Sequence, residues 1–271
     1  MVESGMRSWL AALCIDALDP PGLARFWADA LHWEIDENSR DEIGITPAHG
    51  TGFPILFLPV PGKKVGKNRI HLDLTTTSLD DQAETVASLI ELGGRHVDVG
   101  QRPDEAHVVL ADPEGNEFCV IEPDNAFLAG CGRLGSITCD GSRRVGSFWS
   151  EALGWPLVWD QDEETAIRAP DGTGPFITWG PPVPPKMAKS RLHLDIAPRH
   201  DTDQRQEVDR LISLGAVRID IGEGDVDGVV MADPDGNVPI ARPSHPKGQS
   251  RVVLRDPDGS EFCLLGSRVN A

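Results

Sequence analysis

Apolar and polar positions alternate in two near-identical stretches of the chain. Residues 69–74 read Arg-Ile-His-Leu-Asp-Leu, and residues 191–196, which lie 122 positions later, read Arg-Leu-His-Leu-Asp-Ile. Successive side chains of a β-strand point to opposite faces, so each stretch would place His and Asp on one face and aliphatic residues on the other. The pattern predicts two strands, each with an apolar face against a core and a polar face toward a cavity.

The same offset of 122 relates other landmarks of the chain. The matched pairs are Phe26-Trp27 with Phe148-Trp149, and Leu92-Gly93 with Leu214-Gly215. A constant offset over several landmarks indicates a tandem duplication. The join falls near residues 123–133, where Pro, Asp, Asn and Gly gather. We therefore predict one domain over residues 1–126 and a second over residues 127–271.

The first half of each repeat predicts a strand, a helix and three short strands. In the first repeat the initial strand is expected over residues 10–17. Pro20 favours a first helical turn, and the following apolar residues recur at helical spacing. Gly, Pro and Asn then separate three strands, expected over residues 33–37, 41–46 and 53–59.

The pattern restarts after Gly62. Residues 69–74 are the expected strand, and Ser78 caps a helix that ends at Gly93. The side chains expected to face the sheet are Ala83, Val86, Ala87 and Ile90. Strands are expected near residues 96–99, 107–111 and 117–121, so the chain contains four strand–helix–three-strand units.

Asp-Pro-x-Gly turns close the repeats. Asp112-Pro113-Glu114-Gly115 has the residues that a tight turn requires. The second repeat holds two candidates, residues 233–236 and 256–259. Only the later one precedes a Glu-Phe-Cys segment like that after the first turn, and the earlier one runs into a proline, which is poorly tolerated in a central strand. We predict that the later copy forms the closing hairpin and that residues 222–250 are an inserted loop.

Composition narrows the function classes. The chain has 271 residues, 39% of them hydrophobic and 25% charged, which fits a globular protein of two domains. Its formal net charge of −18 argues against nucleic acid or an anionic membrane as partner. We see no signal peptide and no apolar run long enough to span a bilayer. Five cysteines without paired spacing favour reduced thiols, and we expect a cytoplasmic protein.

Together these motifs resemble the vicinal oxygen chelate superfamily, and are most similar to its actinobacterial glyoxalase-like domains. The motifs are Phe-Trp in the first helix, Leu-His-Trp or Leu-Gly-Trp after it, Arg-x-His-Leu-Asp, Leu-Gly-Gly or Leu-Gly-Ala, and Asp-Pro-x-Gly-x-Glu-Phe-Cys. The resemblance covers nearly the whole chain. It implies an α+β fold of paired βαβββ modules whose sheets curve around a cup, one cup per repeat. Relatives include glyoxalase I, extradiol dioxygenases, epimerases, fosfomycin thiol transferases and metal-free bleomycin-resistance proteins.

The resemblance also implies where a metal would bind. Metal-dependent members place His on the first strand, His or Gln on the fifth, and Glu on the eighth. His71 and His193 match the fifth-strand position. Counting back from the first helix puts the first-strand position near Ala12 and Leu134, which cannot bind a metal. The eighth-strand Glu is replaced by cysteine in both repeats.

We therefore expect no metal and no other cofactor. The alternative is an altered metal site, in which Glu117 with Cys119, or Glu261 with Cys263, joins the histidine of its repeat. A His, Cys and carboxylate set suits a borderline metal such as zinc. His71 and His193 are the only metal-ligand candidates that the resemblance itself supports. For each histidine, a structural role and a ligand-binding or acid–base role both remain open.

The expected partner is a small organic molecule bound in one or both cups, by a monomer or a homodimer. The candidate ligand-binding residues are His71, Asp73, Phe57, Glu117, Cys119, His193, Asp195, Trp179, Glu261 and Cys263. Phe57 and Trp179 are included because they occupy equivalent strand positions and offer flat surfaces. The favoured function is metal-independent binding that sequesters an antibiotic or secondary metabolite. The alternative is a lyase, isomerase or dioxygenase-like enzyme with an altered metal site or with His71 or His193 as acid or base.

Overall fold

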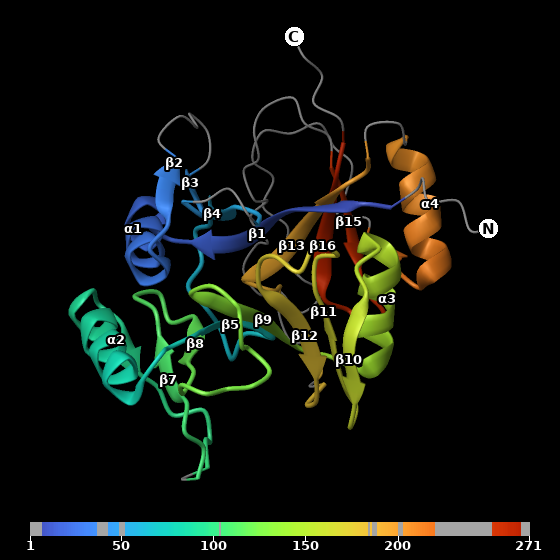
Figure 1. Cartoon of the computed structure of the whole chain (residues 1–271). Coiled ribbons are helices and arrows are strands. Elements are labelled where there is room, and N and C mark those ends of the chain that lie inside the picture. The colour runs from blue at the N-terminus through green and yellow to red at the C-terminus, as the bar shows by residue number, and fades with distance from the viewer. Residues whose placement is uncertain are drawn as a thin grey trace.

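The computed structural model describes residues 7–36, 43–48, 52–102, 104–183, 185, 189–199, 203–219 and 251–266. Within these ranges the chain forms two eight-stranded sheets and helices α1 to α4 (Figure 1). The α+β class is confirmed. None of the helices in these ranges has the length and hydrophobicity that crossing a membrane requires.

Four modules of one strand, one helix and three strands follow one another along the chain. Module 1 contains β1 (Trp9–Ala17), α1 (Pro20–Leu31), β2 (Glu34–Asp36), β3 (Ile43–Thr46) and β4 (Ile55–Pro59). Module 2 contains β5 (Ile70–Leu74), α2 (Leu79–Glu91), β6 (Arg95–His96), β7 (Val108–Ala111) and β8 (Glu117–Val120). Module 3 contains β9 (Leu134–Asp140), α3 (Arg143–Leu153), β10 (Leu157–Gln161), β11 (Glu164–Ile167) and β12 (Phe176–Gly180). Module 4 contains β13 (Leu192–Ala197), α4 (Gln204–Leu214), β14 (Val217–Arg218), β15 (Arg251–Arg255) and β16 (Glu261–Leu265).

Each sheet takes one module from each repeat. Sheet I, with the order β14-β15-β16-β13-β1-β4-β3-β2, joins modules 1 and 4. Sheet II, with the order β10-β11-β12-β9-β5-β8-β7-β6, joins modules 2 and 3. The seams are antiparallel pairs, β1 with β13 and β5 with β9. The expectation of one cup per repeat is therefore wrong, because the first strand of each module pairs with a strand of the other repeat.

Contacts between the two sheets hold each repeat together. In the first repeat, the indole Nε1 of Trp27 on α1 donates to Asp112 Oδ2 in the β7–β8 turn, at 3.1 Å. In the second repeat, Trp149 on α3 makes the equivalent bond to Asp256 at 3.5 Å. Trp27 also packs edge-on against Phe118 of β8, with ring centroids 5.1 Å apart. The repeated Phe-Trp and Asp-Pro-x-Gly motifs thus join module 1 to module 2, and module 3 to module 4.

Hydrophobic periodicity predicts the helices well but misplaces one buried face. Ser78 caps α2 as expected, accepting a bond from the Asp81 amide. The expected inward side chains Ala83, Ala87 and Ile90 are exposed, and the buried stripe runs through Gln82, Thr85 and Leu89. The amide of Gln82 donates to the backbone carbonyls of Ala106 and Val120. Polar side chains can be buried when their hydrogen bonds are satisfied. The positions of the apolar residues therefore predicted the wrong buried face for α2.

The prediction for the closing hairpin is confirmed. Residues 256–259 lie between β15 and β16, and the Gly259 amide donates to the Asp256 carbonyl at 2.9 Å. Gly259 has a φ of 85°, which favours glycine. The earlier copy at residues 233–236 and the predicted insertion over residues 222–250 lie outside the described residues.

Candidate functional site

The His and Asp side chains of both His-x-Asp segments lie on the sheet faces that turn away from the helices. We call these faces the cup faces. In β5 the aliphatic residues Ile70, Leu72 and Leu74 enter the main core, whereas His71 and Asp73 do not. Nε2 of His71 lies 3.5 Å from Oδ1 of Asp73, with 21% of the histidine side chain exposed. The predicted division into an apolar and a polar face is confirmed.

Two hydroxyl groups from the neighbouring strand hold the Asp73 carboxylate. Ser136 and Thr138 of β9 each donate to Asp73 Oδ2 at 2.6 Å. The hydroxyl of Thr178 on β12 donates in turn to that of Thr138 at 3.1 Å. Hydrogen bonds to a carboxylate are among the strong ones. The linked hydroxyl groups therefore hold the Asp73 carboxylate in place and leave its Oδ1 atom facing His71.

Cys119 of β8 completes the polar group on sheet II. Its thiol, the His71 imidazole and the Asp73 carboxylate offer ligand atoms within 4.8 Å of one another. Burial raises the pKa of the Cys119 thiol well above its ordinary range, and the Asp73 carboxylate raises it further. The thiol is therefore protonated near neutral pH, which argues against a thiolate nucleophile here.

The cup face of sheet I carries a second, more deeply buried group. His193 and Asp195 of β13 are 3% and 0% exposed, and Nε2 of His193 lies 3.3 Å from Asp195 Oδ1. Cys14 of β1 lies opposite His193, and these three residues also offer ligand atoms within 4.8 Å of one another. Cys263 of β16 lies beside Asp195. Burial raises the pKa of the Cys263 thiol, and the Asp195 carboxylate raises it further.

Four predicted ligand-binding residues lie in the core or make contacts with neighbouring backbone. Phe57 and Trp179 are 0% and 3% exposed and belong to the main core, and their role as ligand contacts stays a prediction. The alternation of β4 and β12 turns both rings toward the helices. Glu117 pairs with Lys64 at 2.6 Å and accepts from a backbone amide. Glu261 likewise accepts from a backbone amide, so both glutamates fasten the segment before a central strand.

Three residues at the sites, namely Ser136, Thr138 and Cys14, were not predicted from the sequence. Ala12 lies opposite Asp195, and its counterpart opposite Asp73 is Ser136 rather than the predicted Leu134. The segment between the first strand and the first helix is two residues shorter in the second repeat, so counting back from the helix slipped by two. The strand pairs make Ala12 equivalent to Ser136, an offset of 124 rather than 122. The pairing across strands therefore identifies Ser136, whereas the offset of the helices does not.

An apolar wall borders the polar group of sheet II. Its buried members are Val109, Cys119, Ile121, Leu128, Ala166 and Phe176. The Phe127 ring stacks on Phe176 with centroids 4.6 Å apart, and it meets Trp159 edge-on at 5.9 Å. Trp159 is 39% exposed, so it is an aromatic side chain of this wall that a ligand can reach.

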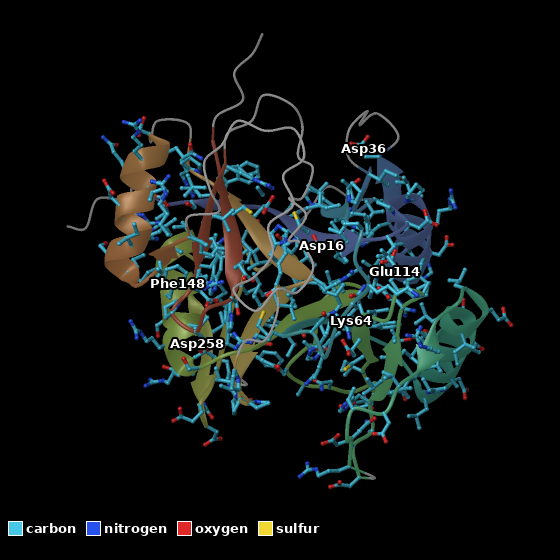
Figure 2. All side chains as sticks on the ribbon, turned by 180° about the vertical axis from the view of Figure 1, so that it is seen from behind. Asp16, Asp36, Lys64, Glu114, Phe148 and Asp258 are labelled. Carbon is cyan, nitrogen blue, oxygen red and sulfur yellow. The ribbon has the colours of Figure 1, made fainter. Side chains whose placement is uncertain are left out.

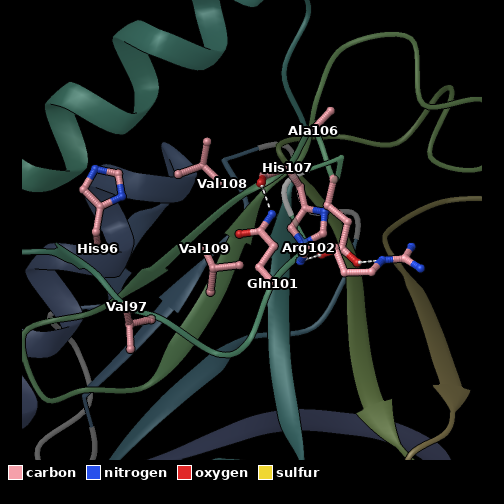
Figure 3. Close-up of a pocket in the computed structure, with 9 residues that line it drawn as sticks. His96, Val97, Gln101, Arg102, Ala106, His107, Val108 and Val109 are labelled. Atoms are coloured by element: carbon pink, nitrogen blue, oxygen red, sulfur yellow. Dashed lines mark hydrogen bonds and ion pairs between the residues drawn. The ribbon is translucent and has the colours of Figure 1, made fainter.

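A pocket of about 410 Å³ opens at the β6–β7 end of sheet II (Figure 3). It is lined by His96, Val97, Gln101, Arg102, Glu105, Ala106, His107, Val108 and Val109. Val109 also belongs to the apolar wall and lies opposite Cys119, and the partly buried Val97 packs against that wall. The volume falls within the usual range for pockets that hold small molecules.

The described residues do not fit the metal-ligand set that the resemblance implies. On sheet II the first-strand positions, which lie on β9, hold Ser136 and Thr138. The hydroxyl groups of both residues donate hydrogen bonds to Asp73. The nearest glutamates on the last strand of each repeat, Glu117 and Glu261, accept hydrogen bonds from backbone amides. A His, His-or-Gln and Glu set therefore cannot assemble on either cup face from these residues.

Comparisons with known proteins agree with this fold. A family model described as a glyoxalase-like domain matches residues 12–121 and 136–240. The structure of glyoxalase I from Zea mays is similar, with a TM-score of 0.58 and 14% identity over 96% of this chain and 93% of that chain. A putative dioxygenase from Bacillus subtilis has a TM-score of 0.53 and 13% identity, over 97% of this chain and 86% of that chain. No curated protein matches the chain. Identities this low show the shared fold alone.

Proposed function

Because the chain belongs to the glyoxalase-like domain family, we propose that it binds a small organic molecule on the cup face of sheet II, without the family's usual metal set. The arrangement around His71 and Asp73 carries this proposal. Two hydroxyl donors occupy one oxygen of Asp73, and the other oxygen faces a histidine that solvent reaches. The pair offers a fixed polar anchor beside an apolar wall.

The proposed ligand combines a flat apolar body with one hydrogen-bonding group. Trp159 and Phe127 supply aromatic surface for the body, and His71 supplies a donor or acceptor for the polar group. Ligand sites of this kind are mainly apolar with a few well-placed polar groups. An antibiotic or secondary metabolite with an aromatic ring and a hydroxyl or carbonyl group fits that description, and binding without reaction would sequester it.

The experiment is a binding screen with a matched pair of variants. The environment-sensitive dye anilinonaphthalene sulfonate is bound first, and aromatic antibiotics are then tested for displacing it. His71→Asn should weaken the binding of a displacing antibiotic by roughly tenfold or more, since a charge-assisted or neutral hydrogen bond contributes about 1–3 kcal/mol. His193→Asn, the equivalent change on sheet I, should leave the affinity unchanged. Equal affinities for wild type and His71→Asn would refute the proposal.

One observation favours a second function, proton transfer by His71. A carboxylate that is itself held by two hydroxyls lies 3.5 Å from the imidazole, and a carboxylate in this position can orient a general base. In such a reaction the imidazole takes a proton from the carbon beside a substrate carbonyl, and returns a proton to the same or the adjacent carbon. Hydrogen–deuterium exchange at the carbon of a small α-hydroxyketone in D₂O, followed by NMR, distinguishes this enzyme from a binding protein. Exchange that occurs with the wild type and is lost in His71→Asn would support proton transfer by His71.

A further inference from the structure

The buried polar group of sheet I differs from that of sheet II at two matched positions. Opposite Asp73, sheet II has Ser136, whereas sheet I has Ala12 opposite Asp195. Opposite the histidine, sheet II has Thr138 and sheet I has Cys14. A methyl group and a thiol thus replace the two hydroxyls that hold Asp73. The same His-x-Asp segment is placed in a different donor environment.

The imidazole of His193 points into this group without a hydrogen bond. Its Nε2 atom is buried and makes none with the described residues, and the closest carboxylate oxygen, Asp195 Oδ1, lies 3.3 Å away. Leaving such a polar atom buried without a hydrogen bond is unfavourable. A cation bound through Nε2 would remove that cost.

The three donor atoms have the spacing and chemistry of a metal site. The ligand atoms of Cys14, His193 and Asp195 all lie within 4.8 Å of one another. They come from β1 and β13, two paired strands at the middle of sheet I, so the backbone fixes their relative positions. A thiolate, an imidazole and a carboxylate form a mixed sulfur, nitrogen and oxygen set that suits zinc, whereas magnesium and calcium prefer oxygen alone.

We propose that Cys14, His193 and Asp195 bind a zinc-type divalent cation on the cup face of sheet I. This set differs from the one that the family resemblance implies, since cysteine stands on the first strand and a carboxylate two residues after the histidine replaces the eighth-strand glutamate. Cys263 of β16 lies beside Asp195 in the neighbouring strand, so it borders the site from outside. Three protein ligands leave a fourth position for water or an organic ligand.

Cobalt substitution in the full chain tests the site. The protein is stripped with a chelator and titrated with Co²⁺, and absorption is followed in the near ultraviolet, where thiolate-to-cobalt charge transfer appears. We expect one equivalent of Co²⁺ to produce this band, and Zn²⁺ to abolish it by displacement. Cys14→Ser should remove the band and weaken Zn²⁺ binding on the order of 100-fold or more. Cys119→Ser, which alters the matched group on sheet II, should retain both.

A measurement on the unaltered protein keeps the test independent of variant folding. X-ray absorption of the zinc-loaded wild type should show one sulfur neighbour at about 2.3 Å together with nitrogen or oxygen neighbours at about 2.0 Å. Failure to bind one equivalent of zinc, or a zinc shell without sulfur, would overturn the proposal. So would loss of the cobalt band in Cys119→Ser and its retention in Cys14→Ser, since the metal would then lie on sheet II.

Discussion

The two His-x-Asp segments carry the same side chains and meet different neighbours. On sheet II the aspartate is held by Ser136 and Thr138, and the histidine side chain is 21% exposed. On sheet I, Cys14 takes the place of Thr138, and the histidine side chain is 4% exposed. Donor type and solvent access therefore distinguish the site that we propose for an organic molecule from the site that we propose for a metal ion.

Replacing Thr138 by valine tests whether the hydroxyls hold Asp73. The variant keeps the side-chain shape and removes one donor from a carboxylate that is only 12% exposed. We expect a loss of about 1–3 kcal/mol in the free energy of unfolding, measured by urea denaturation. Thr178→Val is the matched control, because the Thr178 hydroxyl contacts Thr138 and not Asp73. Equal losses in the two variants would contradict this role.

Asp256 should make stability depend on pH below neutrality. Burial raises the pKa of this carboxyl to about 6, from an unfolded-state value near 3.8. Between these two values the folded chain binds more protons than the unfolded chain, so the group's contribution is fully present below pH 3.8 and is lost as the pH rises through 6. Asp256→Asn cannot titrate. Its free energy of unfolding relative to wild type should therefore be about 2 kcal/mol more favourable at pH 7 than at pH 4.5. Urea denaturation at both pH values measures this difference, and a value near zero would contradict it.

At the scale of elements, one glycine sets how closely a helix approaches its sheet. Gly146 lies on the buried face of α3, and the equivalent position of α1 is Ala24. A Cβ atom added at Gly146 would overlap the side-chain oxygen of Thr165 and lie 2.6 Å from its Cβ. Thr165 belongs to β11, so the missing side chain lets α3 pack directly on this strand.

Gly146→Ala should destabilise the protein although alanine is the better helix former. Helix propensity favours alanine by about 1 kcal/mol, whereas overpacking costs about 1–3 kcal/mol. We expect a net loss of stability in thermal unfolding, and partial recovery when Thr165→Ala is added. Ser147→Ala, on the exposed side of the same helix, reports propensity without overpacking. Stabilisation by Gly146→Ala would show that α3 can move outward freely.

At the scale of the whole molecule, the repeats interlock. Strand pairing joins module 1 to module 4 and module 2 to module 3, whereas helix and turn contacts join the modules within a repeat. Arg191 before β13 donates to Glu114 of the β7–β8 turn at 2.8 Å. Glu114, which is labelled in Figure 2, also accepts from the amides of Leu18 and Asp19. One glutamate thus links sheet I to sheet II.

This interlocking predicts how the separated repeats behave. Residues 1–126 contain β1 and β5 without their partners β13 and β9, so each sheet would end at an exposed central strand. Neither 1–126 nor 127–271 should fold as a stable monomer. When co-expressed they should form a one-to-one complex with the circular dichroism spectrum of the intact chain. A cooperatively folded monomer of either half, seen by ultracentrifugation and denaturation, would contradict the prediction.

Local patterns in the sequence were sufficient for much of the fold. Alternation predicted the two faces of β5 and β13, and the Asp-Pro-x-Gly motif identified the closing turn at residues 256–259. They did not decide on which face of the sheet the rings of Phe57 and Trp179 lie, because an aromatic side chain of a strand can pack against helices or line a cavity. They also missed Ser136, because a loop of different length shifts any count along the chain but leaves the pairing across strands intact.

The sequence by itself determined the four modules, their duplication and the polar face that each His-x-Asp segment presents, because turns, caps and alternation act between neighbours in the chain. Only the tertiary structure decided which modules share a sheet and which side chains meet each histidine. Those contacts join residues more than 60 positions apart, such as Asp73 with Thr138 and Cys14 with His193. A repeat in the sequence records how the chain arose, whereas strand pairing depends on contacts between residues far apart in the chain.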